Sequence, residues 1–150
     1  MNCIIAYMIK IKGVNFMNKN VMKKWVKALR SGKFKQGTGT LKQFNSKGVA
    51  QHCCLGVLCE LYNQDMKKNK KKTLPEKVYD NDSDFSHGYS RFGGKKEDLP
   101  KEVKDWAGMN DNLGKFYLSD HHYECLADLN DIGKKFKTIA DIIEKNYENL

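Results

Sequence analysis

Aspartate and glutamate are absent from the first 59 residues of this 150-residue chain, although that stretch contains eleven lysines and arginines. Residues 60–150 contain sixteen basic and eighteen acidic side chains, so the formal net charge of +9 comes entirely from the first part. A cationic segment without carboxylates of its own attracts anions. We therefore expect the amino-terminal part to bind an anionic partner, either a nucleotide small molecule or a nucleic acid.

The sequence has no long apolar run, and we expect no cleavable signal peptide. The stretch CIIAYMI near the start is far shorter than the roughly 20 apolar residues that a membrane-spanning helix needs. The five cysteines are odd in number and clustered, which is not typical of a secreted disulfide scaffold. These features predict a protein of a reducing cytosol with no membrane partner, and the chain length fits one domain.

Residues 1–16 have two interpretations. The stretch IKGVNFM can be encoded by a purine-rich ribosome-binding site followed by an ATG codon, which predicts that translation naturally begins at Met17. Alternatively, 1–16 is an upstream edge strand, because Ile4, Ala6, Met8 and Ile11 alternate weakly. In both interpretations residues 17–150 form a single globular domain.

The pattern of apolar and turn residues predicts an α+β fold in which a small antiparallel sheet packs with four to five helices. Apolar residues at helical spacing predict helices over 18–31, 99–107, 123–131 and 136–147, and a buried helix from about 54 to 63. The hairpin of the sheet is expected over 40–54, where NSKG separates two strand-like runs. The lysine run 67–72 is expected to be a solvated loop, and 73–94 a strand or an ordered binding loop.

The stretch GKFKQGTGT, residues 32–40, combines glycines with lysines directly after the first helix. Backbone N–H groups of glycine-containing turns can cradle a phosphate, and neighbouring cations add charged donors. It lacks the spacing of a Walker loop and of a dinucleotide fingerprint. The predicted phosphate site comprises Arg30, Lys33, Lys35, Gln36, Gly37, Gly39 and Lys42. The alternative is a flexible loop with solvated lysines.

The stretch QHCCLGVLC, residues 51–59, has three interpretations. His52, Cys53, Cys54 and Cys59 can ligate zinc, although their spacing matches no familiar pattern. A second hypothesis makes Cys54 a thiolate nucleophile, with Gln51 as oxyanion donor. In that hypothesis the base is His121 or His122, which are also further candidate zinc ligands. The third interpretation is plain core packing, because cysteine is among the most buried residue types.

Aromatic side chains close to positive charge can stack on a purine while cations hold its phosphates. One such group is Trp25 with Arg30 and Phe34, and a second surrounds Arg91. The aromatic residues of the second group are Phe85, Tyr89 and Phe92. In addition, Asp128, Asn130 and Asp131 offer oxygen ligands for a metal or a ribose, although the end of a helix explains them equally well.

Four motifs in order carry a family resemblance: WVKALRSGKFKQGTGTL, CCLGVLCEL, LPKEVKDWAG and LADLNDIGKKFKTIADIIE. Together they cover most of 25–144 and resemble a set of small accessory proteins encoded by tailed bacteriophages. Lys134 and Lys135 depart from that pattern, in which a small residue often precedes the phenylalanine. The resemblance implies a viral protein that acts in the cytoplasm of a bacterial host, and it supplies no catalytic residues.

These observations lead to one expectation and two alternatives. We expect a non-enzymatic homo-oligomer without a cofactor that sequesters a phosphorylated nucleotide, such as a cyclic dinucleotide of host immunity. The ligand-binding residues would be those of the phosphate site, with Trp25, Tyr89, Arg91 and Phe92 beside the base. The alternatives are a module that binds nucleic acid or a host protein, and a thiol- or zinc-dependent hydrolase.

Overall fold

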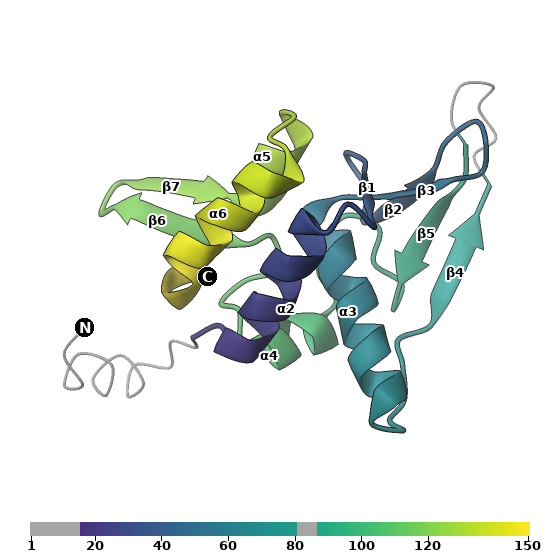
Figure 1. Cartoon of the computed structure of the whole chain (residues 1–150), viewed down its shortest axis with the longest axis horizontal. Coiled ribbons are helices and arrows are strands. Elements are labelled where there is room, and N and C mark those ends of the chain that lie inside the picture. Colours follow the sequence, from purple (N-terminus) through teal and green to yellow (C-terminus); the bar gives the residue numbers. More distant parts are fainter. Residues whose placement is uncertain (1–15, 81–86) are drawn as a thin grey trace.

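A computed structural model describes residues 16–80 and 87–150 of the chain, and it confirms the predicted α+β fold (Figure 1). The helices are α2 (Lys19–Arg30), α3 (Cys54–Lys68), α4 (Lys101–Ala107), α5 (Leu126–Asp131) and α6 (Phe136–Asn146), followed by a 3-10 turn at Tyr147–Asn149. The main sheet has the order β1 (Lys35–Gln36), β3 (Ala50–His52), β2 (Lys42–Phe44), β5 (Tyr89–Phe92) and β4 (Glu76–Tyr79). A separate hairpin pairs β6 (Lys115–Ser119) with β7 (His122–Cys125).

The expected hairpin over 40–54 is present as the antiparallel pair β2 and β3. Strand β1 adds to β3 in parallel, so the sheet is mixed rather than wholly antiparallel. Neither β1 nor the β6–β7 hairpin was predicted: β1 has only two residues, and residues 123–125 of β7 were assigned to the helix expected over 123–131, which begins only at Leu126. The expected strand at 1–16 lies outside the described residues except for Phe16, as does Phe85 of the second aromatic group.

Helix boundaries follow from local signals in most places. The side chain of Asn18 caps α2 by accepting from the backbone N–H of Asn20 and Val21 at 2.9 and 3.2 Å. Gly32 and Gly108 follow their helices with φ of +72°, a conformation that favours glycine. The prediction that the second helix fades at residue 63 was wrong, because α3 continues to Lys68 and includes the first two lysines of the run 67–72. Cations in the last turn favour this extension.

The core lies where α2, α3 and α6 pack together. Helix α2 buries Val21, Met22, Trp25, Val26 and Leu29 as one stripe. The start of α3 approaches the chain before β2 so closely that a Cβ atom on Gly56 would lie 1.7 Å from the carbonyl oxygen of Leu41. Glycine in the CCLG motif is therefore a packing requirement. None of the helices within 16–80 and 87–150 has both the length and the apolar character needed to cross a membrane.

Asn130 at the end of α5 is fully buried and its side-chain amide joins three segments. Its Oδ1 accepts from Nε2 of Gln36 at 3.0 Å and from the backbone N–H of Cys54 at 3.1 Å. Its Nδ2 donates to the carbonyl oxygen of Gly37 at 2.8 Å. The amide thus fixes the loop after β1 and the start of α3 against α5, and each polar group in the cluster has a partner.

We predict that Asn130→Asp lowers the free energy of unfolding by at least about 2 kcal/mol. The substitution keeps the acceptor oxygen but replaces the donor to Gly37 with a second oxygen, which places two acceptors against each other in a buried site. Urea denaturation followed by tryptophan fluorescence measures the loss. The control is Asn20→Asp on exposed α2 surface, expected within about 0.5 kcal/mol of the wild type. Equal stability of both variants would contradict this role of Asn130.

Candidate functional site

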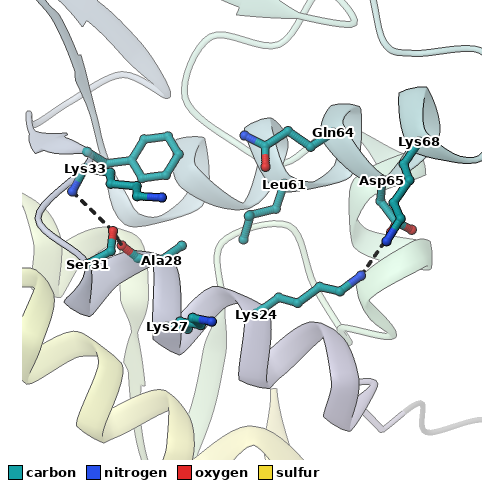
Figure 2. A pocket seen from close by; sticks show the side chains of 10 residues that line it. Lys24, Lys27, Ala28, Ser31, Lys33, Leu61, Gln64, Asp65 and Lys68 are labelled. Atoms are coloured by element: carbon teal, nitrogen blue, oxygen red, sulfur yellow. Dashed lines mark hydrogen bonds and ion pairs between the residues drawn. The ribbon is translucent and has the colours of Figure 1, made fainter.

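The candidate site is a pocket of about 430 Å³ between α2 and α3 (Figure 2). Each helix contributes one face at positions i, i+3, i+4 and i+7. On the first side these are Lys24, Lys27, Ala28 and Ser31, and on the second Leu61, Gln64, Asp65 and Lys68. Lys33 and Phe34, from the segment after α2, complete the lining. The volume is in the usual range for small-molecule sites, about 300–1,000 Å³.

The pocket has an apolar floor, and its positive charges lie at the rim. Ala28, Phe34 and Leu61 are partly buried against the core and supply apolar surface. The side-chain amines of Lys27 and Lys33 make no hydrogen bond or ion pair with any described residue, and both residues are exposed. An apolar floor with unpaired cations at its rim suits a ligand that has both a flat apolar part and anionic groups.

Asp65 is the one carboxylate among the residues that line the pocket. Its Oδ1 accepts from Nζ of Lys24 at 3.0 Å, and its Oδ2 accepts from the indole N–H of Trp106 at 3.2 Å. The hydrogen bond from Lys24 lowers the pKa of Asp65. Partial burial acts in the opposite direction, but its effect is smaller. The carboxylate is therefore ionised at neutral pH and already committed to two donors.

The structure does not bring the predicted phosphate site together. Arg30 points to α6, where its guanidinium contacts Asp141 at 2.5 Å and Glu144 at 2.9 Å. Lys42 is only 14% exposed and is held by Glu60 at 3.0 Å and Glu76 at 2.7 Å. Both cations are neutralised by carboxylates far along the chain, so of the four cations predicted to hold phosphate only Lys33 lines the pocket.

The polar groups of the glycine loop, residues 32–40, make hydrogen bonds to other parts of the protein. The backbone N–H of Gly39, which was expected to face a phosphate, donates to Oδ1 of Asp131 at 2.9 Å. The amide of Gln36 donates to Asn130 and to the carbonyl oxygen of Lys134, and accepts from the N–H of Phe136. Gln36, Gly37 and Gly39 are therefore structural. Asn130 is buried and bonded to the protein, and the exposed Asp131 accepts from Gly39, so the structure engages both with the protein itself and not with the suggested metal or ribose.

The aromatic candidates divide between core and surface. Trp25 is fully buried and its indole N–H donates to the carbonyl oxygen of Cys54 at 2.9 Å, while Phe92 is also fully buried. Neither ring is available to stack on a ligand, so both assignments are corrected. Tyr89 and Arg91 are half-buried on strand β5, and Lys35 is exposed on β1.

The cysteine cluster is core. Cys54 is fully buried and its thiol donates to the carbonyl oxygen of Leu126, whereas His121 and His122 are exposed at the β6–β7 hairpin. Burial raises the pKa of Cys54 and Cys59 well above the ordinary value, and raises that of Cys53 from 9.0 to about 11. A protonated, inaccessible thiol contradicts the nucleophile hypothesis, in which Gln51 was the oxyanion donor.

The zinc hypothesis also fails for the four proposed ligands. Nε2 of His52 lies 2.9 Å from Oε1 of Glu60, and the sulfur of Cys53 caps α3 by accepting from the N–H of Gly56. Over 16–80 and 87–150, no three His, Cys, Asp or Glu side chains come together in a metal-binding arrangement. The four described cysteines are free and buried.

Residues that sequence reasoning missed are those contributed by α3. Gln64, Asp65 and Lys68 lie at the end of the helix that was expected to stop at residue 63, and Lys24 and Lys27 on the first helix were not among the predicted site residues. The matching spacings 24, 27, 28, 31 and 61, 64, 65, 68 are a signal in the sequence. They acquire meaning only once α2 and α3 are known to lie side by side.

The fold and the pocket define a small α+β domain with a cationic, apolar-floored pocket between two helices. Residues 17–147 match a domain of unknown function, DUF8296, and the chain belongs to that family. The comparison with curated proteins and the comparison with solved structures each found no match. The family match includes every residue that lines the pocket.

We predict that Cys53, Cys54 and Cys59 resist alkylation in the folded protein. A pKa of about 11 in place of 9.0 lowers the thiolate fraction of Cys53 at pH 8 about 100-fold, and burial slows the reaction further. Labelling with iodoacetamide followed by peptide mass spectrometry measures each site, with the protein in guanidinium as control. Rapid modification of Cys54 in the native state would restore the thiol hypothesis.

A second prediction concerns Glu60, which lies between Lys42 and His52. Burial alone would raise the pKa of this carboxyl, but hydrogen bonds from His52 and Lys42 outweigh it and lower the pKa below the ordinary 4.5. A lowered pKa contributes stability that is present above about pH 4.5 and is lost as pH falls through the folded-state value. Glu60→Gln should therefore lower the free energy of unfolding at pH 7 by about 1–3 kcal/mol.

The measurement is urea denaturation at pH 7, 5 and 3. The difference between Glu60→Gln and the wild type should persist at pH 5 and shrink at pH 3, where the wild-type carboxyl also becomes protonated. Glu97→Gln on exposed surface is the matched control and should change little at any pH. A pH-independent difference would show that packing rather than charge determines the effect.

Proposed function

We propose that this protein binds a phosphorylated nucleotide in the pocket between α2 and α3 and sequesters it without converting it. The observation that carries the proposal is the pair of unpaired lysines, Lys27 and Lys33, at the rim of a pocket whose floor is apolar. Lysine amines are point charges with three donors and bind phosphate oxygens without demanding one geometry.

The remaining lining residues fit the other part of a nucleotide. Phe34 and Leu61 offer apolar surface to the face of a base, and the ring of Phe34 is held edge-on by His52 at a centroid distance of 5.3 Å. The amide of Gln64 and the hydroxyl of Ser31 are polar groups for the edge of a base or for a sugar. Nucleotides combine these two kinds of surface, which inorganic phosphate does not.

Sequestration is favoured over conversion by the state of the ionisable groups. The carboxylate of Asp65 is held by Lys24 and Trp106, so it is not free to accept a proton from a bound ligand. The other polar groups of the lining are amines, one amide and one hydroxyl. These groups bind and orient a ligand, and a hydroxyl without a neighbouring base is a weak nucleophile.

The phage resemblance extends the proposal to a biological setting. In the cytoplasm of an infected bacterium, a sequestered nucleotide would be a cyclic messenger of host immunity, and its removal would counter host defence. The pocket is an open groove on one chain, and a second copy covering it would enclose a dinucleotide. The proposed active form is therefore a homo-oligomer.

Isothermal titration calorimetry against a panel of cyclic dinucleotides and cyclic trinucleotides tests the proposal. We predict at least one ligand whose affinity falls about 100-fold or more in the double variant Lys27→Gln/Lys33→Gln, because each lysine–phosphate contact contributes roughly 1.5–3 kcal/mol. The matched control is Lys134→Gln/Lys137→Gln, which removes the same charge from exposed positions outside the pocket lining.

Two further results complete the test. Phe34→Ala should weaken nucleotide binding and leave inorganic pyrophosphate unaffected, because only the nucleotide has a base to place on the ring. Native mass spectrometry of the same mixtures should show the ligand bound to an oligomer. If no nucleotide binds, or if both double variants weaken binding equally, the pocket is not the site and the proposal is wrong.

A further inference from the structure

The outer face of the five-stranded sheet is a second cationic surface, distinct from the pocket. The cross-strand pairs of the sheet place one row of residues on this face: Lys35, Gln51, Gln43, Tyr89 and Tyr79. Arg91 and Lys77 form a second pair on the same face. From this arrangement we propose that the face binds single-stranded nucleic acid, with the phosphates on the cations and the bases on the two tyrosines.

The opposite face of the same strands shows why these side chains point outward. Its pairs include His52 with Lys42, and Lys42 with Ser90, and these positions are buried or held by Glu60 of α3. Successive residues of a strand alternate between faces. The burial of one set against α3 therefore commits Tyr89, Arg91 and their partners to the other side, where none of the helices formed by residues 16–80 and 87–150 covers β4 and β5 (Figure 1).

Tyr79 and Tyr89 form a ring pair surrounded by cations. Their rings are stacked with centroids 5.4 Å apart and planes 13° apart. The guanidinium carbon of Arg91 lies 5.1 Å from the ring centre of Tyr79 and 5.9 Å from that of Tyr89. The amines of Lys77 and Lys96 lie 5.2 and 4.5 Å from the centres of Tyr79 and Tyr89. Aromatic rings flanked by basic side chains are the recurring surface for unpaired bases.

The positive charge of this face favours an anionic partner. On the described strands this face carries Lys35, Lys77 and Arg91 but no carboxylate, because Glu76 and the neighbours of Lys42 lie on the opposite side. Nε of Arg91 is buried and has no hydrogen-bond partner. A buried donor without a partner costs stability, and a small rotation of the guanidinium toward a phosphate oxygen would satisfy it.

The extent of the surface favours an extended ligand over a mononucleotide. Four strand spacings of about 4.8 Å separate Lys35 on β1 from Tyr79 on β4, or about 19 Å. Gly37 lies against Gln43 and Gln51, so the loop covers part of the β2–β3 half and leaves the tyrosine half open. A single strand can follow such a surface, whereas a duplex keeps its bases stacked on each other and away from the rings.

Fluorescence anisotropy with a labelled 12-nucleotide oligothymidylate tests the inference, at salt concentrations from 50 to 300 mM. Tyr79→Ala/Tyr89→Ala should weaken binding about 5- to 100-fold without changing the salt slope, because base stacking is lost and charge is kept. Lys77→Gln/Arg91→Gln should weaken binding about tenfold or more at low salt. It should also reduce the slope of log K against log salt by about 1.4, or about 0.7 for each phosphate contact.

Matched controls separate this surface from general charge and from the pocket. Tyr123→Ala removes an exposed tyrosine from the β6–β7 hairpin, and Lys134→Gln/Lys137→Gln removes two positive charges elsewhere; both should change affinity less than twofold. The pocket variant Lys27→Gln/Lys33→Gln should also change oligothymidylate affinity less than twofold. A failure of the proposed pocket can therefore be distinguished from a failure of the proposed sheet face. Circular dichroism verifies that each variant is folded.

Several outcomes would overturn the inference. One is equal affinity for a duplex and for the single strand, together with no effect of the tyrosine variant, since this is the behaviour of general electrostatic attraction. Another is tighter binding of a polyglutamate peptide than of the oligonucleotide, which would assign the face to an acidic protein. Absence of oligothymidylate binding at 50 mM salt would also refute it.

Discussion

The buried amide of Asn130 is the contact on which the arrangement of this protein depends. It holds the loop after β1, the first N–H of α3 and the end of α5 together. Three of the four motifs that carry the phage resemblance meet at this point, namely the glycine loop, CCLG and LADLND. These three motifs therefore indicate a structural junction. Three segments that are distant in sequence form hydrogen bonds with one another in a site that excludes water. A ligand site is not needed to explain those motifs.

Ion pairs between segments distant in sequence account for part of the uneven charge of the chain. The amino-terminal part has no carboxylates, and the later part supplies them across the fold: Asp65 to Lys24, Glu60 to Lys42, and Asp141 with Glu144 to Arg30. Part of the positive excess in the sequence is thus used inside the protein. Lys27 and Lys33 line the pocket and are not paired in this way, so the proposed anion site rests on them and not on Arg30 or Lys42.

Periodicity and capping residues predicted most of the helices, because these signals act within a few residues. Asn18, Gly32 and Gly108 lie at helix ends, which agree with the ranges expected over 18–31 and 99–107 to within two residues. The predicted phosphate site failed for the opposite reason: the partners of Arg30 and Gly39 lie more than 90 residues away, at Asp141 and Asp131. The pocket required one more fact that local patterns do not contain, the side-by-side packing of α2 and α3. Of the residues that the sequence suggested for a site, Lys33 and Phe34 line it.

Helix α3 lies between the pocket and the sheet, and a continuous set of contacts joins them. Phe34 lines the pocket and packs edge-on against His52, His52 contacts Glu60, and Glu60 holds Lys42 on the inner face of β2. The backbone of β2 pairs with β5, which carries Tyr89 on the outer face. The two surfaces lie on different sides of α3 and share no residue, so the two proposed ligands would not compete for the same side chains. Phe34 and the charged cluster around Glu60 form one physical connection through which the two surfaces could influence each other, and double-mutant cycles would measure that coupling.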